Sequence, residues 1–165
     1  MSLKRPWLLT PDRLQRVRAM SKATTPASTW VARVPAGDSF TPSQREWIKR
    51  AVRNAETASG LTFSVFIGVS EEDSRAYAER LHKSLTDPDH SVLVMCDPEF
   101  RRLEIVTGKD ARRVLSDLEC RLAAAAMQTS FAGGDIVGGL TAGIQQLGEA
   151  ARQPRTLHAS RPDLG

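Results

Sequence analysis

The sequence of 165 residues contains few of the residues that build metal and redox sites. Its two cysteines, Cys96 and Cys120, form neither a Cys-x-x-Cys motif nor a zinc-ligand spacing. A domain of this length can bury a stable core without disulfides. We therefore expect both cysteines to be small buried apolar side chains, and the disulfide-rich class is excluded.

Histidine and nucleophile motifs are also scarce. Of the three histidines, His82 has charged neighbours on an expected helix, so we expect a solvent-exposed side chain rather than a general base. His90 precedes an expected strand, where a role in a turn is more natural. No Gly-x-Ser-x-Gly motif, P-loop or Gly-x-Gly-x-x-Gly motif occurs. The chain supplies no convincing nucleophile or metal-bound water, which disfavours an enzyme.

Long hydrophobic runs are absent. Spanning a bilayer takes roughly 18 consecutive apolar residues, and no segment of the chain approaches this. The apolar run Trp7 to Leu9 is far shorter than the ~7–15 residues of a signal-peptide core. We therefore expect a cytoplasmic protein without a signal peptide or a transmembrane segment.

Positive charge is concentrated at the start of the chain. Residues 1–37 hold seven Lys or Arg residues and one Asp, a net charge of +6, whereas the whole chain has +4, so residues 38–165 carry −2. We expect a basic, partly disordered arm (1–37), one domain (38–151) and a flexible tail (152–165). The arm could bind an anionic membrane surface. Few aromatic residues accompany it, so no nucleic acid is expected.

Capping residues and hydrophobic periodicity place the elements of the domain. Thr41-Pro42-Ser43-Gln44 predicts a helix start with a capping box, and Gly60 predicts its end. The expected apolar stripe of this helix is Trp47, Ile48, Ala51, Val52 and Ala55. Strands are expected at 61–69, 91–96 and 102–108, the last two as an antiparallel hairpin, with a further edge strand at 28–34 and helices at 71–85, 118–127 and 131–150.

The order of these elements predicts an α/β sandwich with a mixed sheet, in which the strands 61–69 and 91–96 are parallel. Glycines punctuate the last helix, although glycine costs roughly 1 kcal/mol relative to alanine in a helix interior. Gly139 and Gly143 are four residues apart and share one helix face. We expect them to pack against the sheet or against the helix 118–127, the alternative being close approach to a ligand.

Three blocks together resemble the TPM domain family, which includes thylakoid-lumen and bacterial envelope proteins. They are Gly37-Asp38 through TPSQREWIKRAVRNAETASGLTFSVFIGV, then VLVMCDPEFRRLEIVTG with VLSD, and last FAGGDIVGGLTAGI. The resemblance runs from about Asp38 to Ala150 and fits soluble, uncharacterised actinobacterial members. It implies a three-layer α/β/α sandwich with a small mixed sheet. It also implies either an accessory role or, as reported for some members, acid phosphatase activity and calcium binding.

Two aspartates occupy the positions that the resemblance marks as candidate metal ligands, Asp117 and Asp135. Carboxylates at helix starts can converge on Ca²⁺ or Mg²⁺, but aspartate is equally favoured there as a helix cap. Arg112 stands where many members carry glutamate, which weakens a cation site.

We therefore predict a monomeric, non-enzymatic accessory or protein-interaction domain with an unknown protein partner, peripheral to the membrane through residues 1–37. The alternative is a phosphatase-like hydrolase dependent on a divalent metal held by Asp117 and Asp135.

Overall fold

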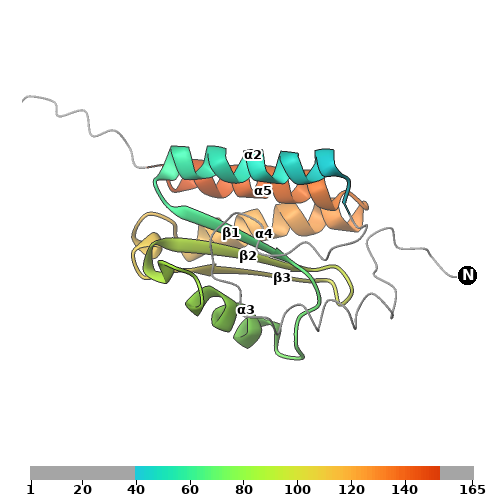
Figure 1. Ribbon diagram of the computed structural model, residues 1–165, viewed down its shortest axis with the longest axis horizontal. Helices are drawn as coiled ribbons and strands as arrows, with labels where there is room; N and C mark the ends of the chain where they lie inside the picture. The colour runs from blue at the N-terminus through green and yellow to red at the C-terminus, as the bar shows by residue number, and fades with distance from the viewer. Residues whose placement is uncertain (1–39, 153–165) are drawn as a thin grey trace, which may run out of the picture.

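A three-stranded sheet lies between two layers of helices in the computed structural model, which describes residues 40–152 (Figure 1). Helices α2 (Pro42–Ser59), α4 (Asp117–Ala132) and α5 (Ile136–Ala150) cover one face of the sheet. Helix α3 (Ser74–Lys83) covers the other face. The predicted three-layer α/β/α architecture is confirmed. The predicted strand at 28–34 lies outside the described residues, as do the basic arm and all of the tail except Arg152.

The sheet is mixed, as the sequence predicts, with the order β1-β2-β3. Strand β1 (Thr62–Ile67) pairs in parallel with β2 (Ser91–Asp97), from Thr62 beside Ser91 to Ile67 beside Cys96. Strand β3 (Arg102–Thr107) pairs antiparallel with β2 and completes the predicted hairpin. Helix α3 lies between β1 and β2 in the chain, so it forms the crossover that a parallel pair requires.

Helix α2 begins and ends where the sequence predicts. Thr41 accepts a hydrogen bond from the backbone N–H of Gln44, and the Gln44 side chain accepts one from the backbone N–H of Thr41. At the other end Gly60 adopts φ +75°, a left-handed conformation that glycine takes without strain. These two caps explain why the sequence alone defines the length of this helix.

The expected helices 118–127 and 131–150 have different boundaries in the structure. Helix α4 begins at a capping box of Ser116 and Glu119 but continues to Ala132, because the residues that break it, Gly133 and Gly134, come later. Helix α5 begins only at Ile136, with Asp135 as its N-cap. Two short 3-10 helices, η1 (Pro88–His90) and η2 (Ala111–Arg113), occupy loops.

Two side chains have the opposite exposure to that predicted. Trp47, expected in the core stripe of α2, is 58% exposed, while its neighbours Ile48, Ala51 and Val52 are buried. His82, expected in solvent, is buried, and its Nε2 lies 3.0 Å from the carbonyl oxygen of Ser91. The charged neighbours of His82 misled the prediction, because α3 turns this residue toward the sheet.

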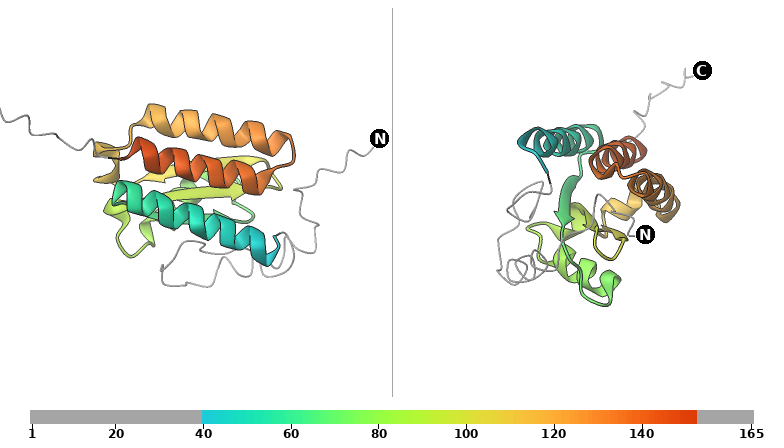
Figure 2. Two further views of the ribbon diagram at one scale, coloured as in Figure 1. Left: turned by 90° about the horizontal axis from the view of Figure 1, so that it is seen from above. Right: turned by 90° about the vertical axis from the view of Figure 1, so that its right-hand side faces the viewer.

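The glycines of α5 pack against helices on both sides, as Figure 2 shows with α5 between α2 and α4. A Cβ atom on Gly139 would lie 2.8 Å from the ring of Phe131, and one on Gly143 would overlap the side chain of Met127. The predicted packing of these glycines against the helix expected at 118–127, which is α4, is therefore confirmed. A Cβ atom on Gly148 would lie only 2.5 Å from the Cα atom of Ala55, so α5 also touches the backbone of α2.

Among the described residues, none of the helices combines the length and the apolar character needed to cross a bilayer.

Candidate functional site

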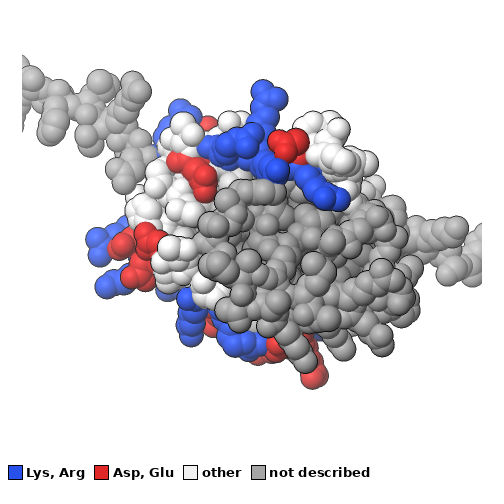
Figure 3. All heavy atoms as spheres, viewed as in Figure 1, with Lys and Arg blue, Asp and Glu red and all other residues white. Residues whose placement is uncertain are grey.

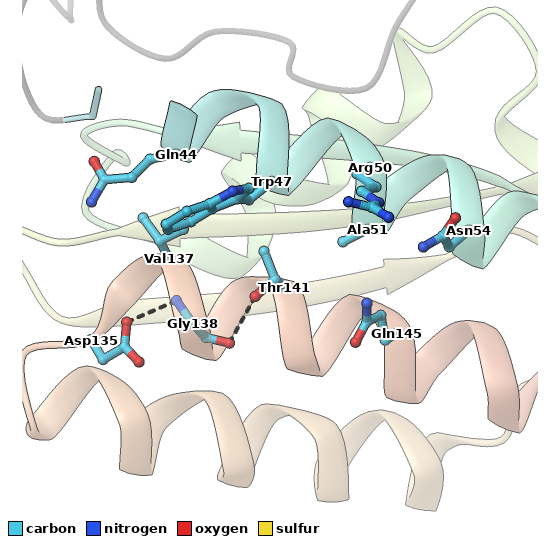
Figure 4. A pocket seen from close by; sticks show the side chains of 10 residues that line it. All are labelled: Gln44, Trp47, Arg50, Ala51, Asn54, Asp135, Val137, Gly138, Thr141 and Gln145. Atoms are coloured by element: carbon cyan, nitrogen blue, oxygen red, sulfur yellow. Dashed lines mark hydrogen bonds between the residues drawn. The ribbon is translucent and has the colours of Figure 1, made fainter. Parts of the chain in front are cut away.

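A groove of about 520 Å³ runs along the outer surface between α2 and α5. The two helices lie side by side and run in the same direction, so the N-terminal half of one faces the N-terminal half of the other (Figure 2). Figure 4 shows the side chains that line the groove. They are Gln44, Trp47, Arg50, Ala51, Asn54, Asp135, Val137, Gly138, Thr141 and Gln145.

The helices touch at one end of the groove and diverge at the other. Contact is closest where Gly148 meets Ala55, because neither residue has a bulky side chain. Toward the start of the helices, Trp47 extends from α2 toward Val137 of α5 and occupies the space between them (Figure 4). The indole is 58% exposed, so it forms an apolar wall that solvent or a ligand can reach.

Asp135 lies at the start of α5, beside Gln44, at one end of the groove (Figure 4). Its Oδ1 accepts a hydrogen bond of 2.8 Å from the backbone N–H of Gly138, which confirms the predicted N-cap. The carboxylate lies so close to the Cα atom of Gly138 that a Cβ atom there would overlap it. The lack of a side chain on Gly138 therefore leaves room for the Asp135 carboxylate. Its second oxygen, Oδ2, stays available to a ligand.

Arg50 lies toward the other end, grouped with Asn54 and Gln145 (Figure 4). Within residues 40–152 the guanidinium of Arg50 has no hydrogen bond or ion pair. The adjacent cation, Lys49, instead bonds Glu46 at 2.9 Å, and this hydrogen bond lowers the pKa of the Glu46 carboxyl. The groove thus has an anion at one end, a cation without a bonding partner among residues 40–152 at the other, and an aromatic side chain between them.

Asp117, the second predicted metal ligand, is far from this groove. It occupies the first turn of α4, whereas Asp135 follows the last residue of the same helix by three positions. At about 1.5 Å per residue, the 16 residues of α4 separate the two carboxylates by roughly 24 Å. The structure therefore does not bring them to one cation. No group of three or more His, Cys, Asp or Glu side chains within residues 40–152 could hold a metal ion.

Arg112, which stands where many TPM members carry glutamate, makes a hydrogen bond in the structure. Its Nε donates a hydrogen bond of 3.4 Å to the hydroxyl of Thr107 at the end of β3. The backbone carbonyl of Asp89 accepts a hydrogen bond of 2.9 Å from the backbone N–H of Asp110.

A second polar cluster, which sequence reasoning missed, lies at the carboxyl ends of β1 and β2. Asp97 is fully buried and its Oδ2 accepts hydrogen bonds from the backbone N–H and the hydroxyl of Ser70, at 2.6 and 2.5 Å. Its Oδ1 accepts from the backbone N–H groups of Glu99 and Phe100. Arg102 donates to the Ser70 hydroxyl from outside. Both carboxylate oxygens are used, so this cluster joins two loops and leaves no open ligand position.

The cysteines offer no reactive nucleophile. Burial raises the pKa of the Cys96 thiol to about 12 and, with the nearby Asp117 and Glu119 carboxylates, that of Cys120 to about 11. The thiolate is the reactive form, and at neutral pH it is scarce at both positions. His90 also has a structural partner, since its Nε2 lies 3.0 Å from the carbonyl oxygen of Gly60.

Charge is mixed on the described surface that faces the viewer in Figure 3. In Figure 3 the Lys and Arg side chains lie among Asp and Glu side chains, and no broad area of one sign appears on the described part of that face. The groove between α2 and α5 likewise holds both signs of charge, with Arg50 and Asp135 among the residues that line it.

Solved structures of similar fold come from several bacteria. The BA42 protein of Bizionia argentinensis, solved by NMR, is 26% identical, with a TM-score of 0.61 over 70% of this chain and 83% of that one. The N-terminal domain of the cg2496 protein of Corynebacterium glutamicum is 16% identical, with a TM-score of 0.56 over 68% of this chain and 74% of that one. These likenesses support the fold described above.

Sequence relatives are mycobacterial, in keeping with the expected actinobacterial kinship. The uncharacterised protein Rv2468c of Mycobacterium tuberculosis is 27% identical over 97 residues, which cover 59% of this chain. The match spans 58% of that relative's length. The family profile described as "Domain of unknown function (DUF5130)" matches residues 20–148, and the chain belongs to this family.

Proposed function

We propose that the domain is a non-enzymatic protein-interaction module that binds its partner in the groove between α2 and α5. The observation that carries this proposal is the exposure of Trp47 in a groove that also holds Arg50, which has no bonding partner in the described part of the chain. Tryptophan and arginine are the residues most enriched among those that dominate binding energy at protein interfaces. A large exposed aromatic side chain that the fold does not need for its own core is consistent with such a role.

Other classes of partner fit the groove less well. A nucleic acid would place phosphates along both helices, and Asp135 would repel them at one end. A membrane surface favours a broad basic face, whereas the charges around the groove have both signs. A protein segment can supply an apolar side chain and charges of both signs, which is the pattern that the groove presents.

In-cell photo-crosslinking tests this proposal. Gln145, which lines the groove, is replaced by the photoreactive residue p-benzoylphenylalanine, and Arg113, whose side chain is 72% exposed outside the groove, is replaced in a matched control. We expect a discrete adduct with another protein from position 145, absent from position 113 and lost when Trp47→Ala is added. The same adduct from both positions, or none from position 145, would contradict the proposal.

We also propose that this chain is related to the TPM domains. This kinship is supported by the three-layer architecture and by the roles of the shared motif residues, since Asp135 caps α5 and Gly139 and Gly143 pack against α4. An accessory role at the cell envelope would follow from this kinship, with residues 1–37 as the membrane-facing part.

No observation on the described residues favours the hydrolase alternative, because Asp117 and Asp135 begin different helices and lie about a helix length apart. It can be tested directly with p-nitrophenyl phosphate and Mg²⁺ or Ca²⁺. Hydrolysis by the wild-type protein that is lost in Asp135→Asn would show a catalytic role and would overturn the non-enzymatic proposal.

A further inference from the structure

The groove ends where α2 and α5 come into contact. Asn54 and Gln145 are the last residues that line it, and just beyond them the backbone of Ala55 meets Gly148. The groove that a bound chain could follow therefore closes there, which favours a chain that ends at this position. At the opposite end of the groove, beside Gln44 and Asp135, the two helices begin.

The side chains at the contact end are suited to a carboxylate. A guanidinium can donate two parallel hydrogen bonds to one carboxylate, and Arg50 has no competing partner within the described residues. The amides of Asn54 and Gln145 flank it from the two helices and can each supply a further N–H donor (Figure 4). A chain that ends at this position would place its own α-carboxylate here.

The positions of the other groove residues along α2 set the spacing of the side chains that a ligand would need. Trp47 and Gln44 lie three and six residues before Arg50 on α2, which corresponds to about 4.5 and 9 Å along the helix axis. An extended chain rises about 3.3 Å per residue, so it covers this length in about three residues. An apolar side chain near the terminus would contact the indole of Trp47, and a basic side chain three residues before the terminus would reach Asp135.

Resting on the proposed interaction function, we propose that the groove binds the extended C-terminal end of a partner protein. The terminal carboxylate binds Arg50 with the amides of Asn54 and Gln145, an apolar side chain packs on Trp47, and a basic side chain three residues upstream pairs with Asp135.

The probe that tests this is the peptide acetyl-Lys-Ala-Leu-Ala with a free C-terminus, titrated into the full-length protein while the indole N–H of Trp47 is followed by NMR. The same peptide with a C-terminal amide should bind about tenfold more weakly, the usual loss for a hydrogen bond to a charged group. Replacing its lysine by glutamate should weaken binding by a similar factor. Equal affinities of the acid and amide forms, or the absence of any shift, would overturn the proposal.

Variants of the protein test which residue binds the carboxylate of the peptide and which binds its lysine. Arg50→Gln should bind the acid and amide forms equally, whereas Arg53→Gln, an exposed arginine of α2 outside the groove, should keep the wild-type preference. Asp135→Asn retains a capping side chain and should abolish the preference for lysine over glutamate. A preference for the acid form that survives in Arg50→Gln would contradict the assignment.

A third peptide identifies the source of the carboxylate. Acetyl-Lys-Ala-Leu-Glu amide carries its carboxylate on a side chain, and we expect it to bind as weakly as the amide form. Affinity equal to that of the free acid would refute recognition of a chain terminus. Because the in-cell adduct from position 145 does not depend on these peptides, an adduct without terminal-carboxylate preference would reject this inference alone.

Discussion

Asp135 serves both the helix and the groove, and two substitutions separate these roles. Its Oδ1 caps α5 through the backbone N–H of Gly138. Asp135→Ala should lower the free energy of unfolding by about 1 kcal/mol, whereas Asp135→Asn should change it by a few tenths, because asparagine caps as well as aspartate. Urea unfolding followed by circular dichroism measures both. Equal losses in the two variants would show that charge, rather than capping, stabilises this helix start.

Asp97 is the most constrained polar residue of the described chain. Its buried carboxylate satisfies donors from Ser70, Glu99 and Phe100, which would lose their acceptor in Asp97→Ala. We expect a loss of about 3 kcal/mol in the free energy of unfolding. The control Asp110→Ala removes only a surface ion pair of 3.8 Å with Arg113 and should stay within about 0.5 kcal/mol. A similar small effect at Asp97 would contradict its structural role.

At the scale of the elements, the two sides of α5 should respond differently to added methyl groups. A Cβ atom on Gly143 would meet the side chain of the buried Met127, whose thioether end is flexible although its Cγ atom lies close to the helix backbone. The gain of helix propensity, about 1 kcal/mol, should then offset part of the crowding in Gly143→Ala. Gly148 faces the backbone of Ala55, which cannot move alone. Gly148→Ala should therefore destabilise the protein by about 1–2 kcal/mol, the usual range of overpacking.

Thermal unfolding of the two variants gives this comparison directly. Equal effects would mean that α2 shifts away from α5 as easily as Met127 changes its rotamer.

Elements with local signals could be predicted closely from the sequence. The caps of α2 and the capping box of α4 involve residues three positions apart, so periodicity and composition suffice to find them. Helix α3 begins at Ser74 rather than near Glu71, because Asp73 is the residue whose side chain caps it through the N–H of Ala76. Glu71, Glu72 and Asp73 follow one another, so the sequence alone does not show which of them precedes the helix.

The groove could not be predicted, because it depends on how α2 and α5 lie against each other. Trp47 has helical spacing with the buried Ile48 and Ala51, and only the position of α5 shows that it lies at the rim rather than in the core. The burial of His82 and the Asp97 cluster could not be predicted for the same reason. The Ser91 carbonyl beside His82 and the Ser70 hydroxyl that bonds Asp97 belong to other segments of the fold. The sequence marks Asp135 as a helix cap and, through the family resemblance, as a candidate metal ligand, but neither signal predicts its place in a groove.

At the scale of the whole molecule, the length of α4 separates the two aspartates once considered for one metal. A Ca²⁺ ion holds its ligands at about 2.3–2.6 Å, so Asp117 and Asp135 cannot share one across a helix of 16 residues. In a calcium titration followed by NMR, Asp117→Asn should leave any shifts of residues 134–137 unchanged. Loss of those shifts in this variant would mean that the two ends of the helix are coupled.

The basic arm gives a further prediction for the whole chain. Residues 1–37 carry a net charge of +6, so the full-length protein should sediment with anionic vesicles at low salt and be released at high salt, where charges are screened. A chain lacking residues 1–37 should stay in the supernatant. Equal binding of both chains would refute a role of the arm at membranes.

The walls of the groove are the first and the last helix of the described chain, α2 and α5. A ligand that contacts both can bind only while these distant segments are assembled, so its binding is thermodynamically linked to folding. At a free concentration of one hundred times its Kd, such a ligand would add about 2.7 kcal/mol to the stability of the domain. A rise in melting temperature with increasing concentration can therefore reveal a groove ligand before its contacts are known.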